Sequence, residues 1–204
     1  MSAQELRPAG ERALLVELAD NSAVHDLAAA LEPLRGSELE EIVPGDRTLL
    51  LVWPGAVPAR GQVEELVAGT GTSARTGSGE TVELEVRYDG VDLEETAEAC
   101  GVTVEQFVER HSSAAYRVAF LGFAPGFAYL TGGDPGLEPP RRAEPRTRVP
   151  AGALAIAGPY SAVYPRESPG GWNLIGSCKE RLFDPRSRNP ALLTAGAAVR
   201  LVAK

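Results

Sequence analysis

The sequence predicts an α+β domain, in which helices cover one face of an antiparallel sheet, followed by an all-β barrel. Three observations support this fold class. Strand-like and helix-like patterns alternate in the first 68 residues, and residues 69–80 are poor in apolar side chains and rich in Gly, Ser and Thr. From residue 116 onward, short apolar runs are separated by Gly and Pro turns. We therefore expect a small α/β sandwich domain at residues 1–80 and a barrel domain, beginning with two short helices, at residues 81–204.

The first domain is predicted to contain a strand, a helix, a hairpin and a second helix, in that order. Residues 13–18 form a short apolar run, and residues 21–34 carry apolar side chains at i, i+3, i+4 and i+7 behind an Asn or Ser cap. Residues 39–43 and 49–53 are extended runs on either side of a Pro-Gly-Asp-Arg turn, which predicts a hairpin. Residues 57–67 have the spacing of a short helix. This order is typical of helices that pack on an antiparallel sheet.

The second domain is predicted to begin with a half-buried strand at residues 81–87 and two short helices at residues 92–100 and 103–111. Asp92 and Thr103 stand where helix caps are expected. The remaining strands are expected at five short apolar runs: 116–123, 149–157, 161–164, 172–175 and 198–202. Many short strands separated by such turns favour a closed or nearly closed barrel. The letters G-T-G-T-S-A before this domain do not predict a dinucleotide site, because a helix precedes them and a strand follows.

The composition is that of a soluble globular protein, with 44% hydrophobic and 24% charged residues. The formal net charge is -8, yet residues 112–204 carry 12 bases and only 6 acids. Overall acidity argues against nucleic-acid binding. The basic half either attracts a small anion or an acidic partner, or is attracted to the acidic half of the chain. Because no run of 18 apolar residues and no secretory signal pattern occurs, we expect a cytoplasmic protein without a membrane span.

Gly122–Gly176 is the segment in which we expect the binding face. Of its 55 residues, 19 are Gly or Pro, and aromatic residues and arginines recur among them. Such a density of fixed and permissive backbone angles suits a surface that holds guanidinium groups and rings around a small ligand. Arg141, Arg142, Arg146 and Arg148 lie within 8 residues, and guanidinium groups bind carboxylates or phosphates through paired hydrogen bonds. The alternative is a solvated basic loop.

The other candidate site residues are rings, glycines and one histidine. The rings of five residues either line an apolar pocket or belong to the barrel core: Phe123, Phe127, Tyr129, Tyr164 and Trp172. Four glycines are expected at positions of positive φ or close backbone approach, where their N–H groups can face an oxyanion: Gly126, Gly152, Gly170 and Gly171. His111 stands at a helix end just before this segment, where it is a candidate for acid–base chemistry or a cation at the helix C-terminus.

Several self-contained activities are disfavoured by the absence of their motifs. The sequence contains no P-loop, no H-E-x-x-H pair and no G-x-S-x-G elbow. If the protein uses ATP, another chain is therefore expected to bind it. Cys100 and Cys178 are too few and too far apart for a metal cluster and are expected to be free thiols. No metal or organic cofactor is evident.

Six ordered motifs between Val86 and Pro185 resemble those of one family. They read V-R-Y-D-G-V-D-L-E, E-R-H-S, L-G-F-A-P-G-F-A-Y-L, P-R-R-A-E-P-R with V-P-A-G, Y-P-R-E-S-P-G-G-W, and L-F-D-P. The family comprises Kip inhibitors, the first subunit of allophanate hydrolase and the B-type subunit of 5-oxoprolinase. The N-terminal pattern is compatible with it, so the resemblance covers essentially the whole chain. The motifs are specific for the family but do not separate its members.

The resemblance implies an N-terminal α/β domain, a C-terminal cyclophilin-like barrel and an activity shared with partners. With a homologous C-type barrel protein and a third 5-oxoprolinase component, such a protein opens the lactam of 5-oxo-L-proline to L-glutamate at the expense of ATP. The chain would then be a non-autonomous part of an enzyme that acts on a small anionic amide substrate. The alternatives within the family are an inhibitor that binds a sensor histidine kinase, and a component of an allophanate or urea pathway.

The resemblance also assigns residues. His111 matches the motif histidine and would be catalytic, as a proton shuttle or by polarising the amide oxygen. The implied substrate-binding positions are Arg141, Arg146, Tyr164, Trp172, Gly126, Phe127, Gly170 and Gly171. Two positions depart from the common pattern: Ala153 stands where a serine is usual, and Ser177 where an arginine is usual. Loss of these polar groups bears on ligand specificity, because buried polar groups matched to a substrate discriminate strongly.

Overall fold

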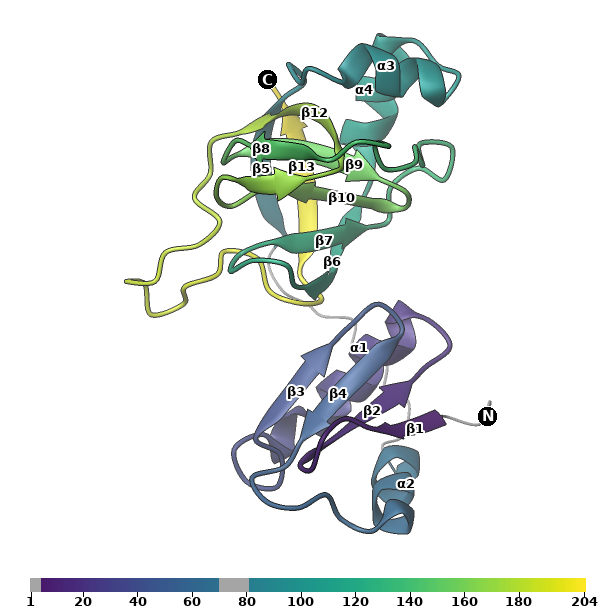
Figure 1. The fold of residues 1–204 in the computed structure, drawn as a ribbon, viewed down its shortest axis with the longest axis vertical. Coiled ribbons are helices and arrows are strands. Elements are labelled where there is room, and N and C mark those ends of the chain that lie inside the picture. The colour runs from purple at the N-terminus through teal and green to yellow at the C-terminus, as the bar shows by residue number, and fades with distance from the viewer. Residues whose placement is uncertain (1–4, 70–80) are drawn as a thin grey trace. The chain divides into compact units, whose positions relative to one another are not determined.

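The computed structural model describes residues 5–69 and 81–204 of the chain. Its contacts divide the chain into two compact units, with the division between residues 78 and 79. Figure 1 shows both units, and each is described by itself. Of the connection expected at residues 69–80, Gly69 ends a helix and the rest lies outside the described residues.

The first unit is a four-stranded antiparallel sheet with helices packed against it. Its elements are β1 (Glu5–Pro8), β2 (Ala13–Glu17), α1 (Asn21–Leu31), the 3-10 turn η1 (Glu32–Leu34), β3 (Glu41–Pro44), β4 (Thr48–Val52) and α2 (Arg60–Gly69). The strands follow the order β1-β2-β4-β3, and α1 packs against β3 and β4 (Figure 1). This arrangement confirms the predicted sheet with helices, including the hairpin formed by β3 and β4.

Three details of the first unit differ from the prediction. α1 ends at Leu31 rather than at residue 34, because Pro33 has no N–H to continue the helical hydrogen bonds and a 3-10 turn follows. Asp20 caps this helix in place of the expected Asn or Ser, by accepting a 2.9 Å hydrogen bond from Ala23 N. β1 was not predicted, since Leu6 is the one buried residue of this strand and no apolar alternation marks it.

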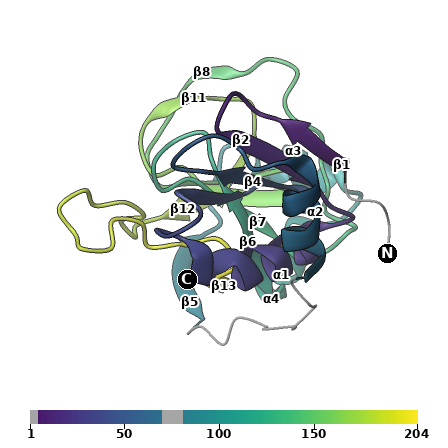
Figure 2. The same ribbon diagram turned by 90° about the horizontal axis from the view of Figure 1, so that it is seen from below.

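The second unit is a closed β-barrel that two helices accompany. Its elements are β5 (Val82–Arg87), α3 (Leu93–Ala99), α4 (Val104–Ser113), β6 (Tyr116–Leu121), β7 (Ala128–Thr131), β8 (Arg146–Val149), β9 (Ala153–Ala157), β10 (Tyr160–Val163), β11 (Ser168–Gly170), β12 (Asn173–Cys178) and β13 (Ala198–Ala203). The barrel order is β10-β7-β6-β13-β5-β12-β9, and pairing of β9 with β10 closes it. β8 and β11 form a separate two-stranded sheet (Figure 2). The predicted barrel is therefore confirmed.

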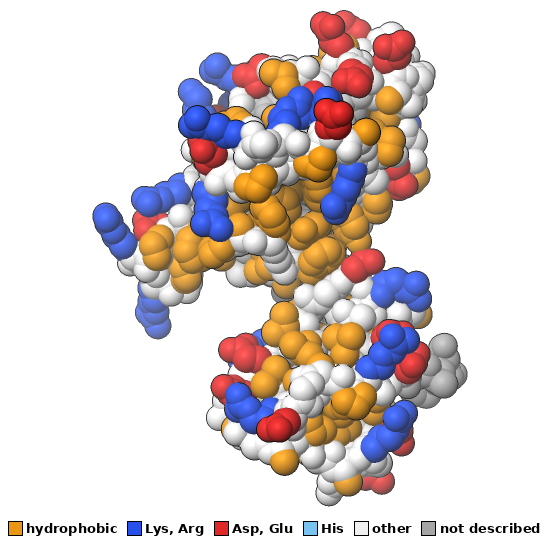
Figure 3. Space-filling view, in the orientation of Figure 1, with side chains coloured by type: hydrophobic (Ala, Val, Ile, Leu, Met, Phe, Trp, Pro, Cys, Tyr) orange, Lys and Arg blue, Asp and Glu red, His pale blue; other side chains and the backbone are white. Residues whose placement is uncertain are grey.

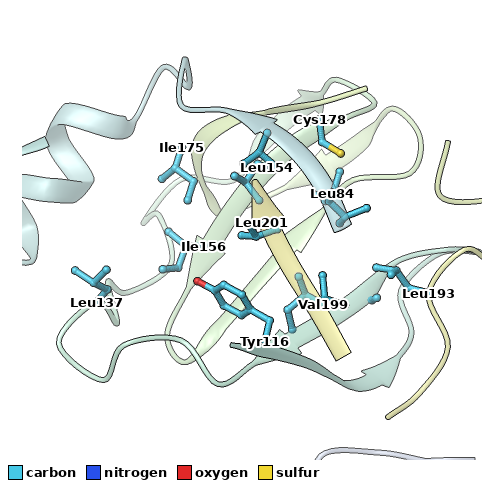
Figure 4. Packing of buried hydrophobic residues seen from close by; sticks show 14 of the residues in the cluster. Leu84, Tyr116, Leu137, Leu154, Ile156, Ile175, Cys178, Leu193, Val199 and Leu201 are labelled. Atoms are coloured by element: carbon cyan, nitrogen blue, oxygen red, sulfur yellow. The ribbon is translucent and has the colours of Figure 1, made fainter. Parts of the chain in front are cut away.

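The barrel has apolar packing on both sides of strand β9. Figure 4 shows Leu84, Leu154, Ile175 and Leu201 converging in the interior. All residues of β9 are buried: Leu154 and Ile156 belong to the interior core, whereas its three alanines belong to a second cluster on the outer face. Successive side chains of a strand point to opposite faces, so β9 is a wall between two apolar clusters. Its small outer side chains leave room for large rings.

The predicted strand at residues 149–157 is in fact two strands, β8 and β9. Pro150 has no N–H for a strand ladder, and Gly152 adopts a φ of 80° in the turn between them. β7 and β11 were not predicted, because both are short and lie within the Gly- and Pro-rich segment. Among the helices in the described part of the chain, none combines the length and the apolar character needed to cross a lipid bilayer.

Candidate functional site

An aromatic cluster of Phe127, Tyr164 and Trp172 covers the outer face of β9. The three side chains are only 2%, 2% and 5% exposed, respectively. The ring of Phe127 lies 5.2 Å from that of Tyr164 and 5.7 Å from that of Trp172, and both pairs meet edge to face. Edge-to-face pairs bring a positive ring edge to a negative ring face, which holds the rings in fixed orientations. The cluster is therefore packed like a core, although it lies outside the barrel interior.

Arg141 lies over the outermost ring of this cluster. Its guanidinium carbon is 5.9 Å from the centroid of the Trp172 ring, within the range of a cation–π interaction. The other arginines of the segment have carboxylate partners: Arg148 pairs with Glu167, and both Arg142 and Arg146 pair with a single aspartate. Within the part of the chain that the structure describes, no carboxylate forms an ion pair with Arg141. Its charge therefore remains available to an anionic ligand.

A pocket of 510 Å³ opens beside Arg141. Its lining residues are Glu95, Thr96, Ala99, Pro139, Pro140, Arg141, Arg142, Ala143, Glu144 and Asn173. The volume lies within the range of roughly 300–1,000 Å³ that is common for small-molecule sites. On the face of the barrel that Figure 3 shows, basic and acidic side chains lie among apolar ones. The site thus combines a cation on a ring with a concave surface of small-molecule size.

Asp92 is the partner of two of the four arginines in the 141–148 segment. Its Oδ1 accepts hydrogen bonds from Arg142 Nη1 at 2.9 Å and from Arg146 Nη2 at 2.6 Å, and its Oδ2 accepts one from Leu174 N at 2.7 Å. The side chain of Asp92 is 4% exposed. Charge-assisted hydrogen bonds of this kind are roughly twice as strong as those between neutral groups. Asp92 therefore ties the arginine segment and strand β12 to the start of α3.

The prediction that Asp92 caps a helix is confirmed for its position and corrected for its side chain. Asp92 is the N-cap residue of α3, but its side chain makes no capping hydrogen bond. Thr103, by contrast, caps α4 as predicted. The sequence signal for Asp92 was its position in V-R-Y-D-G-V-D-L-E. A single sequence cannot distinguish a cap from an ion pair, because the arginine partners lie 50 and 54 residues away.

Tyr164 lies near two of these arginines. Burial raises the pKa of its hydroxyl, Tyr129 adds to this, and the positive charges of Arg141 and Arg146 act in the opposite direction. The structure therefore brings Arg141, Arg146 and Tyr164 into one neighbourhood with Phe127 and Trp172. The substrate-binding role of these residues stays a prediction.

His111 lies elsewhere, on α4, with its buried ring against Phe107 and Tyr116 of the barrel core. Its ring is stacked on Phe107, with centroids 5.7 Å apart. Nδ1 is 2.8 Å from the Tyr88 hydroxyl and Nε2 is 2.8 Å from Ser161 Oγ. Burial lowers the pKa of His111 to about 3, so the ring is neutral at pH 7. Burial also raises the pKa of Tyr88, so this hydroxyl keeps a proton that it can donate to Nδ1.

The barrel wall separates His111 from the aromatic cluster. Val163 of β10 belongs to the interior core, and Ser161 therefore faces the interior as well, because side chains two residues apart share a face. Ala162 and Tyr164 belong to the outer cluster. The catalytic role of His111 stays a prediction, and its two hydrogen bonds inside the barrel favour a structural role instead.

The glycine predictions have mixed outcomes. Gly126 and Gly152 have φ values of 81° and 80°, and a Cβ at Gly170 would overlap the Tyr164 hydroxyl, so the predicted special backbone positions are confirmed for these three. The prediction for Gly171 is wrong, since its φ is not positive and a Cβ would have its nearest neighbour at 3.6 Å. The N–H of Gly152 already donates to Tyr164 O over 2.7 Å. That the other glycine N–H groups face an oxyanion stays a prediction.

Both cysteines are free thiols, as expected. Cys178 Sγ donates to Glu180 Oε2 over 2.8 Å, and burial raises its pKa to about 12. Within residues 5–69 and 81–204, no three His, Cys, Asp or Glu side chains lie close enough together to hold a metal ion.

Comparison with known proteins places these features in a family context. Residues 4–193 match the family model described as carboxyltransferase domain, subdomain C and D. Over 124 aligned residues, the chain is 50% identical to the B-type subunit of 5-oxoprolinase from Escherichia coli O157:H7. The aligned region is 59% of this chain and 57% of that protein. Over 127 aligned residues, it is 43% identical to the B-type subunit of 5-oxoprolinase from Haemophilus influenzae. This second aligned region is 61% of this chain and 60% of that protein. The chain thus matches less than two thirds of the length of these relatives.

Two solved structures share the fold. The crystal structure of TTHA0988 superposes on this chain with a TM-score of 0.83, and the two sequences are 37% identical. The match covers 95% of this chain and 40% of that chain. The urea amidolyase of Kluyveromyces lactis is 19% identical with a TM-score of 0.74, over 98% of this chain and 15% of that chain. At this low identity, the second likeness shows the fold alone.

Proposed function

Because the chain belongs to the carboxyltransferase domain family, subdomains C and D, we propose that it is one component of an ATP-dependent 5-oxoprolinase. The observation that carries this proposal is the 50% identity to the B-type subunit of 5-oxoprolinase from Escherichia coli O157:H7. The complex would also contain a homologous C-type barrel protein and a third protein. Together they would open 5-oxo-L-proline to L-glutamate, with ATP bound outside this chain.

The pocket beside Arg141 supports this proposal through its chemistry. The substrate carries a carboxylate and a lactam on a five-membered ring. Arg141 offers a guanidinium to the carboxylate, and Ala99 and Pro140 offer apolar surface in the same pocket. Asn173 donates from its side-chain nitrogen to Pro140 O and Ile156 O, which leaves its side-chain oxygen to accept the lactam N–H. Phe127 and Tyr129 pack edge to face against the Trp172 ring, over which Arg141 lies.

In this proposal, the chain contributes substrate binding and orientation rather than a complete set of reacting groups. A neutral His111 cannot donate a proton as a general acid at pH 7, and both its ring nitrogens already have partners inside the barrel. The partner proteins would supply the remaining groups. Orientation alone accelerates reactions substantially when the reacting atoms are held close together.

Reconstitution tests the proposed function. We expect the purified chain, mixed with the C-type barrel protein and the third protein, to release glutamate from 5-oxo-L-proline only when ATP is present. Arg141→Ala is expected to raise KM about tenfold or more, because a hydrogen bond between charged groups contributes roughly 1.5–3 kcal/mol. Arg148→Ala is the matched control, since Arg148 is exposed and pairs with Glu167. A well-folded mixture that releases no glutamate would reject the proposal.

A second candidate function, docking to a sensor histidine kinase, is favoured by one observation. Phe123 is 59% exposed and adopts a φ of 66°, a conformation that non-glycine residues rarely adopt. Strained backbone conformations cluster at functional sites, and an exposed ring there offers apolar surface to a partner. If this function holds, the chain lowers kinase autophosphorylation and Phe123→Ala weakens that effect about tenfold or more. Autophosphorylation that is unchanged by the native chain would reject it.

A further inference from the structure

We infer that Asp92 is a positioning residue that divides the arginines of the pocket: it holds Arg142 and Arg146 in place and leaves Arg141 to bind the anionic group of the ligand. The inference rests on the proposed function, which supplies the ligand, but its evidence is separate. It also chooses between Arg141 and Arg146, both of which the resemblance implied as substrate-binding positions.

The geometry of the two arginines is set by a single oxygen. Arg142 Nη1 and Arg146 Nη2 both donate to Asp92 Oδ1, over 2.9 Å and 2.6 Å. Arg142 also reaches the exposed Glu95 at 3.4 Å. Arg142 lines the pocket, but its Nη1 cannot move to a ligand without breaking the hydrogen bond to the buried Asp92 carboxylate, and the same holds for Arg146 Nη2. Asp92 therefore holds both guanidinium groups.

The Asp92 carboxylate balances the positive charges of Arg142 and Arg146. Arg142 Nε and Arg146 Nη1 are buried and have no hydrogen-bond partner among the described residues. Unpaired buried donors are unfavourable, so the Asp92 carboxylate is what keeps these guanidiniums in place. If its charge were removed, both cations would gain by moving toward water or toward another anion. Arg142 already lines the pocket, so its released guanidinium would be available to the ligand.

Asp92 also anchors the strand that carries the pocket residues. Its N donates to Leu174 O over 2.9 Å, and its Oδ2 accepts from Leu174 N over 2.7 Å. Leu174 directly follows Trp172 and Asn173 in the chain, so this paired contact holds the start of β12 against α3. The same residue thus positions these two arginines and the ring on which Arg141 lies.

A double-mutant cycle in the reconstituted complex tests the inference, with KM for 5-oxo-L-proline as the measured quantity. In the native background, Arg141→Ala is expected to raise KM about tenfold or more. In an Asp92→Asn background, it is expected to raise KM less than about threefold, because Arg142 or Arg146 is then free to bind the carboxylate. A purely structural Asp92 would change the amount of folded complex but leave the effect of Arg141→Ala at tenfold, and this result would overturn the inference.

The controls separate failure of the inference from failure of the proposed function. Glu94→Gln removes an exposed carboxylate from the same helix, and the effect of Arg141→Ala should remain tenfold in that background. If the native complex is inactive, the proposed function fails. In that case the dissociation constant of 5-oxo-L-proline is measured for the full chain and the same variants. The inference is overturned if the effects of Arg141→Ala and Asp92→Asn on this constant are additive, or if 5-oxo-L-proline does not bind.

A second variant covers the case in which Asp92→Asn does not fold. Arg146→Gln removes one of the two cations that Asp92 holds. We expect it to lower the melting temperature by about 4 °C or more, while raising KM far less than Arg141→Ala does. Equal rises in KM for Arg141→Ala and Arg146→Gln would show that both arginines bind the ligand. This result would overturn the inference that Asp92 holds Arg146 while Arg141 binds.

Discussion

Replacing Gly90 with alanine is expected to lower the free energy of unfolding of the barrel by about 3 kcal/mol or more. A Cβ at this position would overlap three backbone atoms of β12: Leu174 O, Ile175 C and Gly176 N. Backbone atoms cannot rotate away as a flexible side chain can, so the segment before α3 would have to separate from β12. This separation would also break the 2.9 Å hydrogen bond from Asp92 N to Leu174 O.

The two tryptophans make this change measurable in the barrel alone. Trp172 belongs to the barrel and Trp53 to the first unit, so fluorescence in a Trp53→Phe background reports urea unfolding of the barrel. Gly122→Ala is the matched control, because its Cβ would meet Tyr129 at an ordinary 3.8 Å. We expect the control to change the free energy of unfolding by less than about 0.5 kcal/mol. Similar losses for Gly90→Ala and Gly122→Ala would contradict the close approach at Gly90.

Acidification is the second condition with a large expected effect. The pKa of His111 is about 3 in the folded barrel and near 6.5 when the chain unfolds. Between these two values, the unfolded state binds one more proton than the folded state, so stability rises with pH and is lost as the pH falls. The contribution is about 1.4 kcal/mol per pH unit, or about 3 kcal/mol between pH 6 and pH 4.

His111→Gln isolates this contribution from that of the carboxylates. Glutamine keeps a side-chain amide for hydrogen bonding but does not titrate, so the variant should be less stable than the native chain at pH 7. The difference in the free energy of unfolding should shrink by about 3 kcal/mol as the pH falls from 6 to 4. Parallel pH profiles for the two proteins would mean that His111 titrates normally, and its predicted acid–base role would then regain support.

Periodicity in the sequence predicted most of the fold because it reflects which face of an element is buried. The spacing at residues 21–31 and the alternation at residues 82–87 are local, and the structure has a helix and a strand there. β1 and β11 escaped prediction because their burial patterns contain one and no buried residue, respectively. Such strands form through backbone pairing with a neighbour, which side-chain patterns do not record.

The site was predicted only in part. The sequence alone determined the segment that carries the arginines and rings, since Gly and Pro constrain the backbone locally and guanidinium groups have the same chemistry in any fold. The structure was needed to show that Arg141 lies over Trp172 with no carboxylate partner among the described residues. It was also needed to show that Arg142 and Arg146 meet Asp92 and that the ring of His111 is buried. The physical reason is that ion pairs and burial depend on which distant segments pack together, and a linear pattern does not specify these contacts.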